Sequence, residues 1–229
     1  MNLAPTKPWI IFDAVGTLIE PTPSVAEAYW SIGQQLGSRI SLAEVGRRFR
    51  EKFASSNPQP DAEHASSEAI ELARWEAIVR HVLDDVRDQK LCFQRVHRHF
   101  SKPGAWQVFN DVEETFQGLK NKGYRLAIGS NFDHRLYDVC QGHSEFRSVD
   151  ATFASAELGY RKPSLNFYAE LAKRLETLPS HMLMVGDDLE NDVIAAEAAG
   201  LKSILIDRSG DYAGPYRSVQ RLTMLPQVL

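Results

Sequence analysis

The chain has 229 residues, of which 43% are hydrophobic and 24% are charged, and its formal net charge at pH 7 is −4. These values are ordinary for a folded globular protein, and the negative charge argues against nucleic acid as a partner. Only Cys92 and Cys140 are present, without a CxxC pair, so neither a disulfide framework nor a thiolate zinc site is indicated. Because the sequence contains no signal-like or membrane-spanning apolar stretch, we expect a cytoplasmic protein that does not bind membranes.

The first predicted element is a short buried strand, residues 8–13, which ends on Asp13. Every periodic segment from about residue 22 to residue 100 is then helical. Thr22 is expected to cap the first helix, with Pro23 at its first position. Apolar residues recur at helical spacing within residues 25–36, 45–53, 70–83 and 91–100, and a polar loop is expected at 55–68. We expect Trp30, Trp75 and Trp106 to pack in the core or near the hinge of this helical part.

After about residue 105, helices and strands alternate. Helices are predicted at residues 111–122, 133–141, 164–176 and 189–200, and strands at 124–130, 151–155, 182–188 and 203–207. Such alternation is typical of a parallel sheet with helices on both faces. The sequence therefore predicts an α/β fold with a doubly wound parallel sheet. Its core would comprise about residues 1–19 and 105–229, with an inserted helical domain of about residues 20–104.

Polar residues follow the ends of four predicted strands. They are Asp13, Ser130 with Asn131, Lys162 within the stretch GYRKP, and Asp187 with Asp188. In an open α/β sheet, ligands bind outside the carboxyl ends of the strands. A carboxylate there can attack phosphorus, a hydroxyl and a lysine can hold phosphoryl oxygens, and an acidic pair can hold Mg²⁺. The pattern predicts phosphate chemistry.

The stretches FDAVGT, GSN, GYRKP and GDDLEND, in this order, resemble the four motifs of the haloacid dehalogenase superfamily. The resemblance covers essentially the whole chain. Within the superfamily, the sequence resembles the branch that has a helical cap after the first strand. Within that branch, it resembles the group called haloacid dehalogenase-like hydrolase domain-containing protein 3. It implies a Rossmann-like core and a Mg²⁺-dependent hydrolase. The most direct expectation is a phosphatase, monomeric or homodimeric, acting on a small phosphorylated molecule.

The resemblance also implies roles for individual residues around the phosphoryl group. Asp13 would be the nucleophile that forms an aspartyl-phosphate. Ser130 and the backbone N–H of Asn131 would bind the transferring phosphoryl group. Lys162 would bridge that group and the Asp13 carboxylate. From the residues alone, Ser130 could instead cap the helix that begins near Asp133.

A second set of residues would form the metal site by the same resemblance. Asp13 and Asp187 would bind Mg²⁺ with their carboxylates, and Val15 would contribute its backbone carbonyl. Asp188 and Asp192 would support the metal. For these last two, a simpler role at the N-terminus of the following helix is a comparable alternative, because acidic residues favour the first turn.

Val15 is the departure from the superfamily pattern. Its phosphatases carry at this position a second aspartate, which protonates the leaving group and later activates the water that clears the intermediate. Such proton transfers contribute typically about 10²–10⁴-fold. Val15 removes this contribution and leaves the nucleophile, the metal ligands and the phosphate-binding residues in place.

Three other functions are compatible with the sequence. A haloacid dehalogenase uses the same nucleophile without the second aspartate, but needs no metal, which the acidic GDDLEND stretch does not suit. A phosphonatase would need a lysine in the helical part, for which Lys52 is the main candidate and Lys90 and Lys102 lie near its far end. The third alternative is a binding protein that has lost catalysis.

Overall fold

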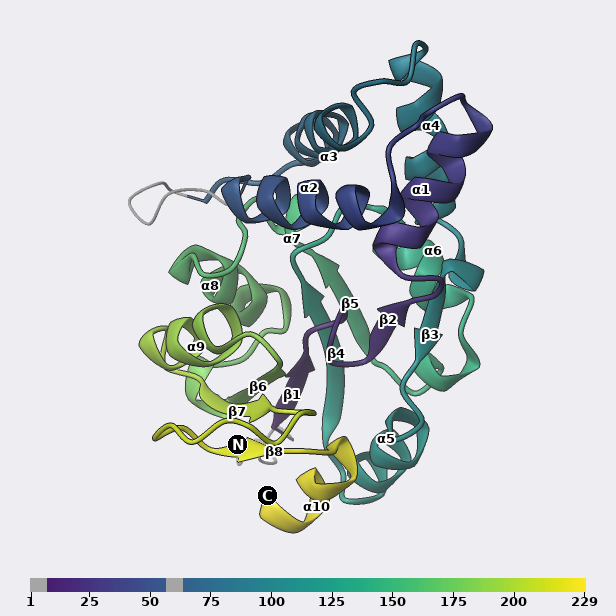
Figure 1. Ribbon diagram of the computed structural model, residues 1–229. Helices are drawn as coiled ribbons and strands as arrows, with labels where there is room; N and C mark the ends of the chain where they lie inside the picture. Colours follow the sequence, from purple (N-terminus) through teal and green to yellow (C-terminus); the bar gives the residue numbers. More distant parts are fainter. Residues whose placement is uncertain (1–7, 57–63) are drawn as a thin grey trace.

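The computed structural model describes residues 8–56 and 64–229. Residues 1–7 and the middle of the predicted polar loop, residues 57–63, lie outside the described residues. The chain forms a sheet-containing core with a layer of helices above one end of the sheet (Figure 1). None of the helices within the described ranges is long and apolar enough to cross a membrane.

A six-stranded sheet, ordered β5-β4-β1-β6-β7-β8, forms the centre of the core, and every pair in it is parallel. Its strands are β1 (Trp9–Phe12), β4 (Arg125–Ser130), β5 (Ala151–Ala154), β6 (Met182–Gly186), β7 (Lys202–Ile206) and β8 (Ser218–Val219). The prediction of a doubly wound parallel sheet is confirmed. The edge strand β8 has two residues, too few to give a periodic signal, and was not predicted.

The two faces of the sheet are covered by different helices, because successive side chains of a strand point to opposite faces. On β1, Ile10 and Phe12 join the apolar cluster that includes α5 (Val112–Asn121) and α6 (Arg135–Gln141). Trp9 and Ile11 pack instead with α8 (Leu165–Arg174) and α9 (Ala195–Ala198). The strand is therefore buried on both sides, which fixes the position of the residue that follows it.

The helical layer consists of α1 (Val25–Gln35), α2 (Leu42–Ser55), α3 (Glu68–Val82) and α4 (Gln89–His99), as the periodicity predicted. It leaves and rejoins the core beside a small antiparallel pair, β2 (Ile19–Pro21) and β3 (Trp106–Val108). Its buried residues Tyr29, Val79 and Val96 belong to the same apolar cluster as Phe12. The helices thus rest on the sheet core through continuous apolar packing.

Two local predictions in this region are wrong. The first helix begins at Val25, and Ser24 rather than Thr22 is its N-cap, accepting a hydrogen bond from the Glu27 backbone N–H. The Glu27 carboxylate in turn accepts a hydrogen bond from the Ser24 backbone N–H. This capping box outweighed the signal of a proline at the first helical position. Trp30 is 37% exposed and does not belong to the buried apolar cluster.

The remaining elements are short. They are α7 (Ser155–Leu158), α10 (Leu225–Val228), a π-helical turn at Leu189–Ile194, and 3₁₀ turns at Pro103–Ala105, Ser144–Phe146, Pro179–His181 and Leu222–Met224. The π-helical turn and α9 together replace the single helix predicted at residues 189–200.

Candidate active site

Asp13 and Lys162 meet at the carboxyl end of the sheet. Asp13 directly follows β1, and its backbone N–H donates to the carbonyl of Val185 on β6. Lys162 comes from the loop after α7, and its Nζ lies 2.6 Å from Asp13 Oδ1. Both residues are buried, at 8% and 4% exposure. One oxygen of the Asp13 carboxylate is thereby fixed by the lysine.

The same ammonium group also binds Asp192, with Nζ 2.6 Å from Asp192 Oδ1. Burial alone would lower the pKa of Lys162, but the charges of Asp13 and Asp192 raise it, so the lysine is protonated. Burial, together with the charge of Asp13, raises the pKa of Asp192, while Lys162 opposes that rise. Asp192 therefore serves as the second counter-charge that holds Lys162 in position.

Asn131 fixes the loop that carries Lys162. Its side-chain amide donates to the Lys162 carbonyl oxygen over 2.9 Å, and its Oδ1 accepts from the Lys162 backbone N–H over 2.8 Å. These two bonds join the loops that follow β4 and β5. Ser130, at the end of β4, is buried beside them and lines the same cavity as Asp13. It does not cap α6, whose N-cap residue makes no side-chain capping bond.

Asp187 follows the end of β6 and is exposed toward the cavity. Its Oδ1 accepts a hydrogen bond from Thr17 Oγ1 over 2.9 Å. Desolvation by the surrounding chain, together with the charge of Asp13, raises its pKa to about 6. Gly16 makes this approach possible, because it has a φ of +89° and a Cβ there would lie 2.2 Å from Asp187 Oδ2.

The Asp188 side chain binds the first backbone N–H groups of the next helix. Its side chain accepts hydrogen bonds from the N–H groups of Glu190 and Asn191 and from the Asn191 side-chain amide. The carboxylate therefore caps the π-helical turn, which is the alternative role expected for an acidic residue at this place.

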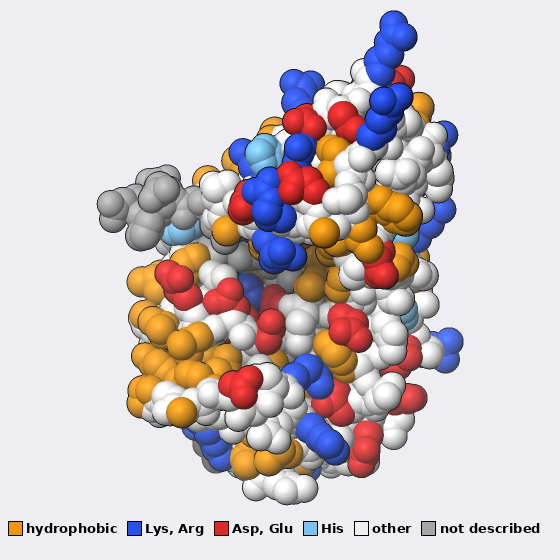
Figure 2. Space-filling view, viewed as in Figure 1, with side chains coloured by type: hydrophobic (Ala, Val, Ile, Leu, Met, Phe, Trp, Pro, Cys, Tyr) orange, Lys and Arg blue, Asp and Glu red, His pale blue; other side chains and the backbone are white. Residues whose placement is uncertain are grey.

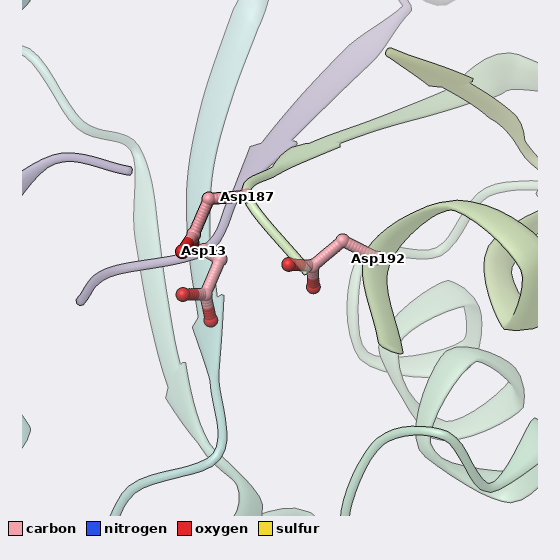
Figure 3. A group of neighbouring side chains, drawn as sticks. All are labelled: Asp13, Asp187 and Asp192. Atoms are coloured by element: carbon pink, nitrogen blue, oxygen red, sulfur yellow. The ribbon is translucent and has the colours of Figure 1, made fainter. Parts of the chain in front are cut away.

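The carboxylates of Asp13, Asp187 and Asp192 converge from β1, the end of β6 and the helix that follows (Figure 3). One oxygen of each lies within 4.8 Å of the others. Oxygen ligands of this kind suit Mg²⁺, which takes one or two carboxylates and completes its shell with water and phosphate oxygens. Both oxygens of Asp192 are engaged, one by Lys162 and the other by the Asp188 backbone N–H, whereas Lys162 holds a single oxygen of Asp13. Asp13 and Asp187 are therefore the pair best placed to hold a cation.

A cavity of about 400 Å³ lies between the helical layer and the sheet end, within the size range of small-molecule sites. Its floor carries Asp13, Ser130, Lys162 and Asp187, and Val15 lines it as well. The surface is hollowed there, with side chains of both charges and apolar side chains around the opening (Figure 2). The sequence pattern predicted the floor, but not the residues of the helical layer that form the roof.

A buried ion pair ties that helical layer to the lysine loop. Arg161 Nη1 lies 2.6 Å and 2.7 Å from the two carboxylate oxygens of Glu71 on α3. Backbone bonds reinforce the contact, from the Arg161 N–H to the His64 carbonyl and from the Ser66 N–H to the Gly159 carbonyl. Because Arg161 precedes Lys162, the helical layer is connected directly to the active-site loop.

Replacing Glu71 should destabilise the protein strongly. Both side chains are nearly fully buried, at 1% for Glu71 and 6% for Arg161, so Glu71→Gln leaves a buried guanidinium without its counter-charge. Breaking such a pair costs about 3–5 kcal/mol. The matched control is Glu76→Gln on the same helix, whose exposed pair with Arg80 should contribute at most about 1 kcal/mol. Urea unfolding of both variants checks this, and equal losses would contradict it.

Comparison with known proteins relates this chain to a family of hydrolases. The sequence profile of the haloacid dehalogenase-like hydrolases matches residues 8–200. "Haloacid dehalogenase-like hydrolase domain-containing protein 3" of Mus musculus is 26% identical over 96% of this chain and 90% of its own length. The "Glyceraldehyde 3-phosphate phosphatase" of Methanothermobacter thermautotrophicus is 28% identical over 48% of this chain and 49% of its own.

A solved structure extends the likeness to the fold. The L-2-haloacid dehalogenase of Xanthobacter autotrophicus, with chloropropionic acid covalently bound, superposes with a TM-score of 0.73. It covers 97% of this chain and 98% of its own at 16% identity, so it shows a common fold and nothing finer. The parallel sheet and the profile match agree with one another. This chain belongs to the haloacid dehalogenase-like hydrolase family.

Proposed function

We propose that this chain is a Mg²⁺-dependent phosphatase that acts on a small phosphorylated molecule through an aspartyl-phosphate on Asp13. The observation that carries the proposal is the position of Asp187, whose carboxylate stands close to Asp13 beside Lys162. Mg²⁺ bound by the two aspartates would neutralise their mutual repulsion and the charge of the phosphoryl group. Lys162 holds one oxygen of Asp13 and leaves the other to attack phosphorus.

The same observation separates this proposal from a dehalogenase. A dehalogenase needs no cation, and a third carboxylate near the nucleophile would then only repel the incoming carboxylate of a haloacid. Burial, and after it the charge of Asp13, raises the pKa of Asp187, so the ionised carboxylate is unfavourable there without a cation. The cluster is better explained as a cation site, which favours phosphoryl transfer.

A phosphonatase receives less support. Among the described residues, Lys162 is the lysine that lines the cavity, whereas Lys52, Lys90 and Lys102 do not line it. A lysine of the helical layer that formed a Schiff base with the substrate would have to reach into this space.

The direct test is hydrolysis of p-nitrophenyl phosphate with Mg²⁺ and with EDTA, beside chloride release from L-2-chloropropionate. We expect phosphate release that needs Mg²⁺ and disappears in Asp13→Asn, and no chloride release. Chloride release without Mg²⁺ would favour the dehalogenase. The absence of both activities would favour a binding protein.

Mg²⁺ binding should depend on pH, because Asp187 must lose its proton to bind the cation. With a pKa of about 6, Asp187 is ionised at about pH 8 and mostly protonated at about pH 5. We therefore expect Mg²⁺ to raise the melting temperature at about pH 8, by mass action, and much less at about pH 5. Thermal melts of the wild type and Asp187→Asn measure this. An equal shift in Asp187→Asn would place the cation elsewhere.

In EDTA, where no Mg²⁺ is bound, the stability contributed by Asp187 changes with pH in the opposite direction. Because the pKa of Asp187 is raised above its ordinary value of 3.8, the folded chain holds the proton more tightly than the unfolded chain. This group therefore favours folding as the pH falls through about 6, and that contribution is lost above it. Melts in EDTA should show a gain at lower pH that Asp187→Asn reduces.

A further inference from the structure

The cavity above Asp13 is divided into a polar floor and an aromatic wall. This inference rests on the proposed phosphatase activity and concerns which phosphate esters the enzyme accepts. The floor residues Asp13, Lys162 and Asp187 would bind the phosphoryl group and Mg²⁺. The rest of the cavity faces whatever the phosphoryl group is attached to, so its lining determines the leaving group.

In the helical layer, five rings follow one another along this wall. Ring centroids are 6.1 Å apart between Trp75 and Phe53, 5.5 Å between Phe53 and Phe49, 5.4 Å between Phe49 and Tyr29, and 6.1 Å between Tyr29 and Phe100. All five residues line the cavity. These spacings are those of favourable aromatic pairs. Phe53 remains 37% exposed, so part of its ring is open to a ligand.

The series continues into the sheet core and reaches the active-site loops. Trp106 lies 5.8 Å from Phe100, and Phe132 lies 5.8 Å from Trp106, directly after the Ser130-Asn131 turn. At the floor, Val15 adds an apolar side chain that is 37% exposed. The wall therefore runs from α3 down to the polar floor, and the guanidinium groups of Arg74 and Arg135 lie over the rings of Phe53, Trp75 and Phe132. A planar aromatic group suits such a lining better than a polar sugar or polyol does.

The chemistry at Val15 points to the same class of substrate. When an oxygen of Asp13 bonds to phosphorus, the bond from phosphorus to the ester oxygen breaks and its electron pair leaves with that oxygen. With valine in place of the general acid, the leaving oxygen must hold this charge without being protonated by residue 15. A phenolate can hold it because the ring delocalises it, whereas the alkoxide of an unsubstituted aliphatic alcohol is a much stronger base and a much poorer leaving group. Water then attacks the aspartyl-phosphate and releases inorganic phosphate.

Tyr29 adds a polar contact within this wall. The residue is 1% exposed and lines the cavity, and its hydroxyl has no hydrogen-bond partner among the described residues. Burial raises the pKa of this phenol, and the charges of Arg135 and Arg74 oppose the rise. A buried hydroxyl without a partner is unfavourable, and a ligand that supplies an acceptor relieves that cost.

We propose that the substrate is an aryl phosphate, with its ring held by the aromatic wall and an acceptor substituent on the ring bound by the Tyr29 hydroxyl. Neither observation depends on the other, since the wall concerns shape and Val15 concerns the acidity of the leaving group. Both disfavour the same alternative, the phosphate ester of an unsubstituted aliphatic alcohol.

The decisive comparison uses two leaving groups of similar acidity, one with a ring and one without. Phenyl phosphate and hexafluoroisopropyl phosphate meet this condition. With Mg²⁺, we expect kcat/KM for phenyl phosphate to be at least about tenfold higher, because the ring also gains aromatic contacts. Equal kcat/KM values would overturn the proposal and leave the phosphatase activity intact.

If neither ester is hydrolysed, the proposed phosphatase activity fails, and binding decides the inference separately. Calorimetry with Mg²⁺ should then show phenylphosphonate binding at least about tenfold more tightly than isopropylphosphonate. Equal affinities would overturn the aromatic preference.

Two substitutions connect the preference to the wall. Phe53→Leu removes a partly exposed ring from the cavity wall. Trp30→Leu is the control, because Trp30 on α1 has the same 37% exposure and does not line the cavity. Phe53→Leu should reduce the preference for phenyl over hexafluoroisopropyl phosphate severalfold, and Trp30→Leu should keep it. The same preference in both variants would show that the wall does not bind the ring.

Tyr29→Phe tests the polar contact. In this variant, KM for 4-acetylphenyl phosphate should rise about five- to tenfold more than KM for phenyl phosphate. The reason is that the acetyl group loses its single hydrogen bond to the Tyr29 hydroxyl, and phenyl phosphate has no such group. The melting temperature should not fall, because the hydroxyl has no hydrogen-bond partner within residues 8–56 and 64–229. A lower melting temperature with an unchanged KM ratio would mean that the hydroxyl serves the fold and not the substrate.

Discussion

Lys162→Met should reduce phosphate release by at least about 10³-fold, the upper end of the effect of removing one electrostatic contact in an active site. The lysine holds Asp13 and Asp192 at 2.6 Å each, so its loss frees the Asp13 carboxylate to rotate and removes the cation that faces the phosphoryl group. Mg²⁺ cannot replace both contacts, because the lysine stands between Asp13 and Asp192. The measurement is single-turnover phosphate release with p-nitrophenyl phosphate.

The structural part of this effect can be separated from the chemical part. Lys162→Met leaves the buried carboxylate of Asp192 without its partner, which should destabilise the fold until that group takes up a proton. In the double variant Lys162→Met/Asp192→Asn the unpaired charge of Asp192 is gone and only Asp13 still lacks its partner, so the melting temperature should recover in part while the activity stays lost. Recovery of activity in the double variant would mean that Lys162 only supports the fold.

The sheet could be predicted because its strands are buried on both faces and its helices repeat at a regular spacing. The side chains at the strand ends then follow from parallel topology, which brings Asp13, Ser130, Lys162 and Asp187 to one edge. The pair β2–β3 could not be predicted, since each of its strands has three residues and its partner lies more than 80 positions away. A pattern of period two needs a longer segment to be recognised.

The contacts that position the site were less predictable than the site residues themselves. Glu71 and Arg161 are 90 positions apart, and nothing in the local sequence of α3 marks this glutamate as buried. Likewise, the spacing of Tyr29 and Phe49 indicates only that they face inward. Whether they face a packed interior or a cavity depends on how α1 and α2 cross, which pattern alone does not specify.

Val15→Asp should increase the hydrolysis of alkyl phosphates by about 10–10³-fold and that of aryl phosphates much less. Aspartate and valine are similar in size, and the Gly16 turn that follows can stay unchanged. The new carboxylate can protonate the leaving oxygen and then activate the water that clears the aspartyl-phosphate. The gain is expected to stay below the full range for general acid–base catalysis, because the surrounding residues were not arranged for a carboxylate.

The surroundings of residue 15 also give the new carboxylate suitable acidity. Asp13 and Asp187 are negatively charged neighbours across the same cavity, and their charges should raise its pKa toward that of a useful general acid. At 37% exposure the desolvation is partial, so the neighbouring charges rather than burial should cause most of the rise. The pH profile of the variant should therefore gain a falling limb at high pH that the wild type lacks.

The measurement is kcat/KM for matched aryl and alkyl phosphates across a series of leaving-group acidities. In the wild type, the logarithm of kcat/KM should fall steeply as the pKa of the leaving alcohol rises, and Val15→Asp should make that slope shallower. Val15→Asn is the control, because it has nearly the same shape as the aspartate variant and cannot transfer a proton. If the asparagine variant gains as much as the aspartate variant, or if the wild-type slope is already shallow, the proton comes from another group and Val15 is not the reason for the preference.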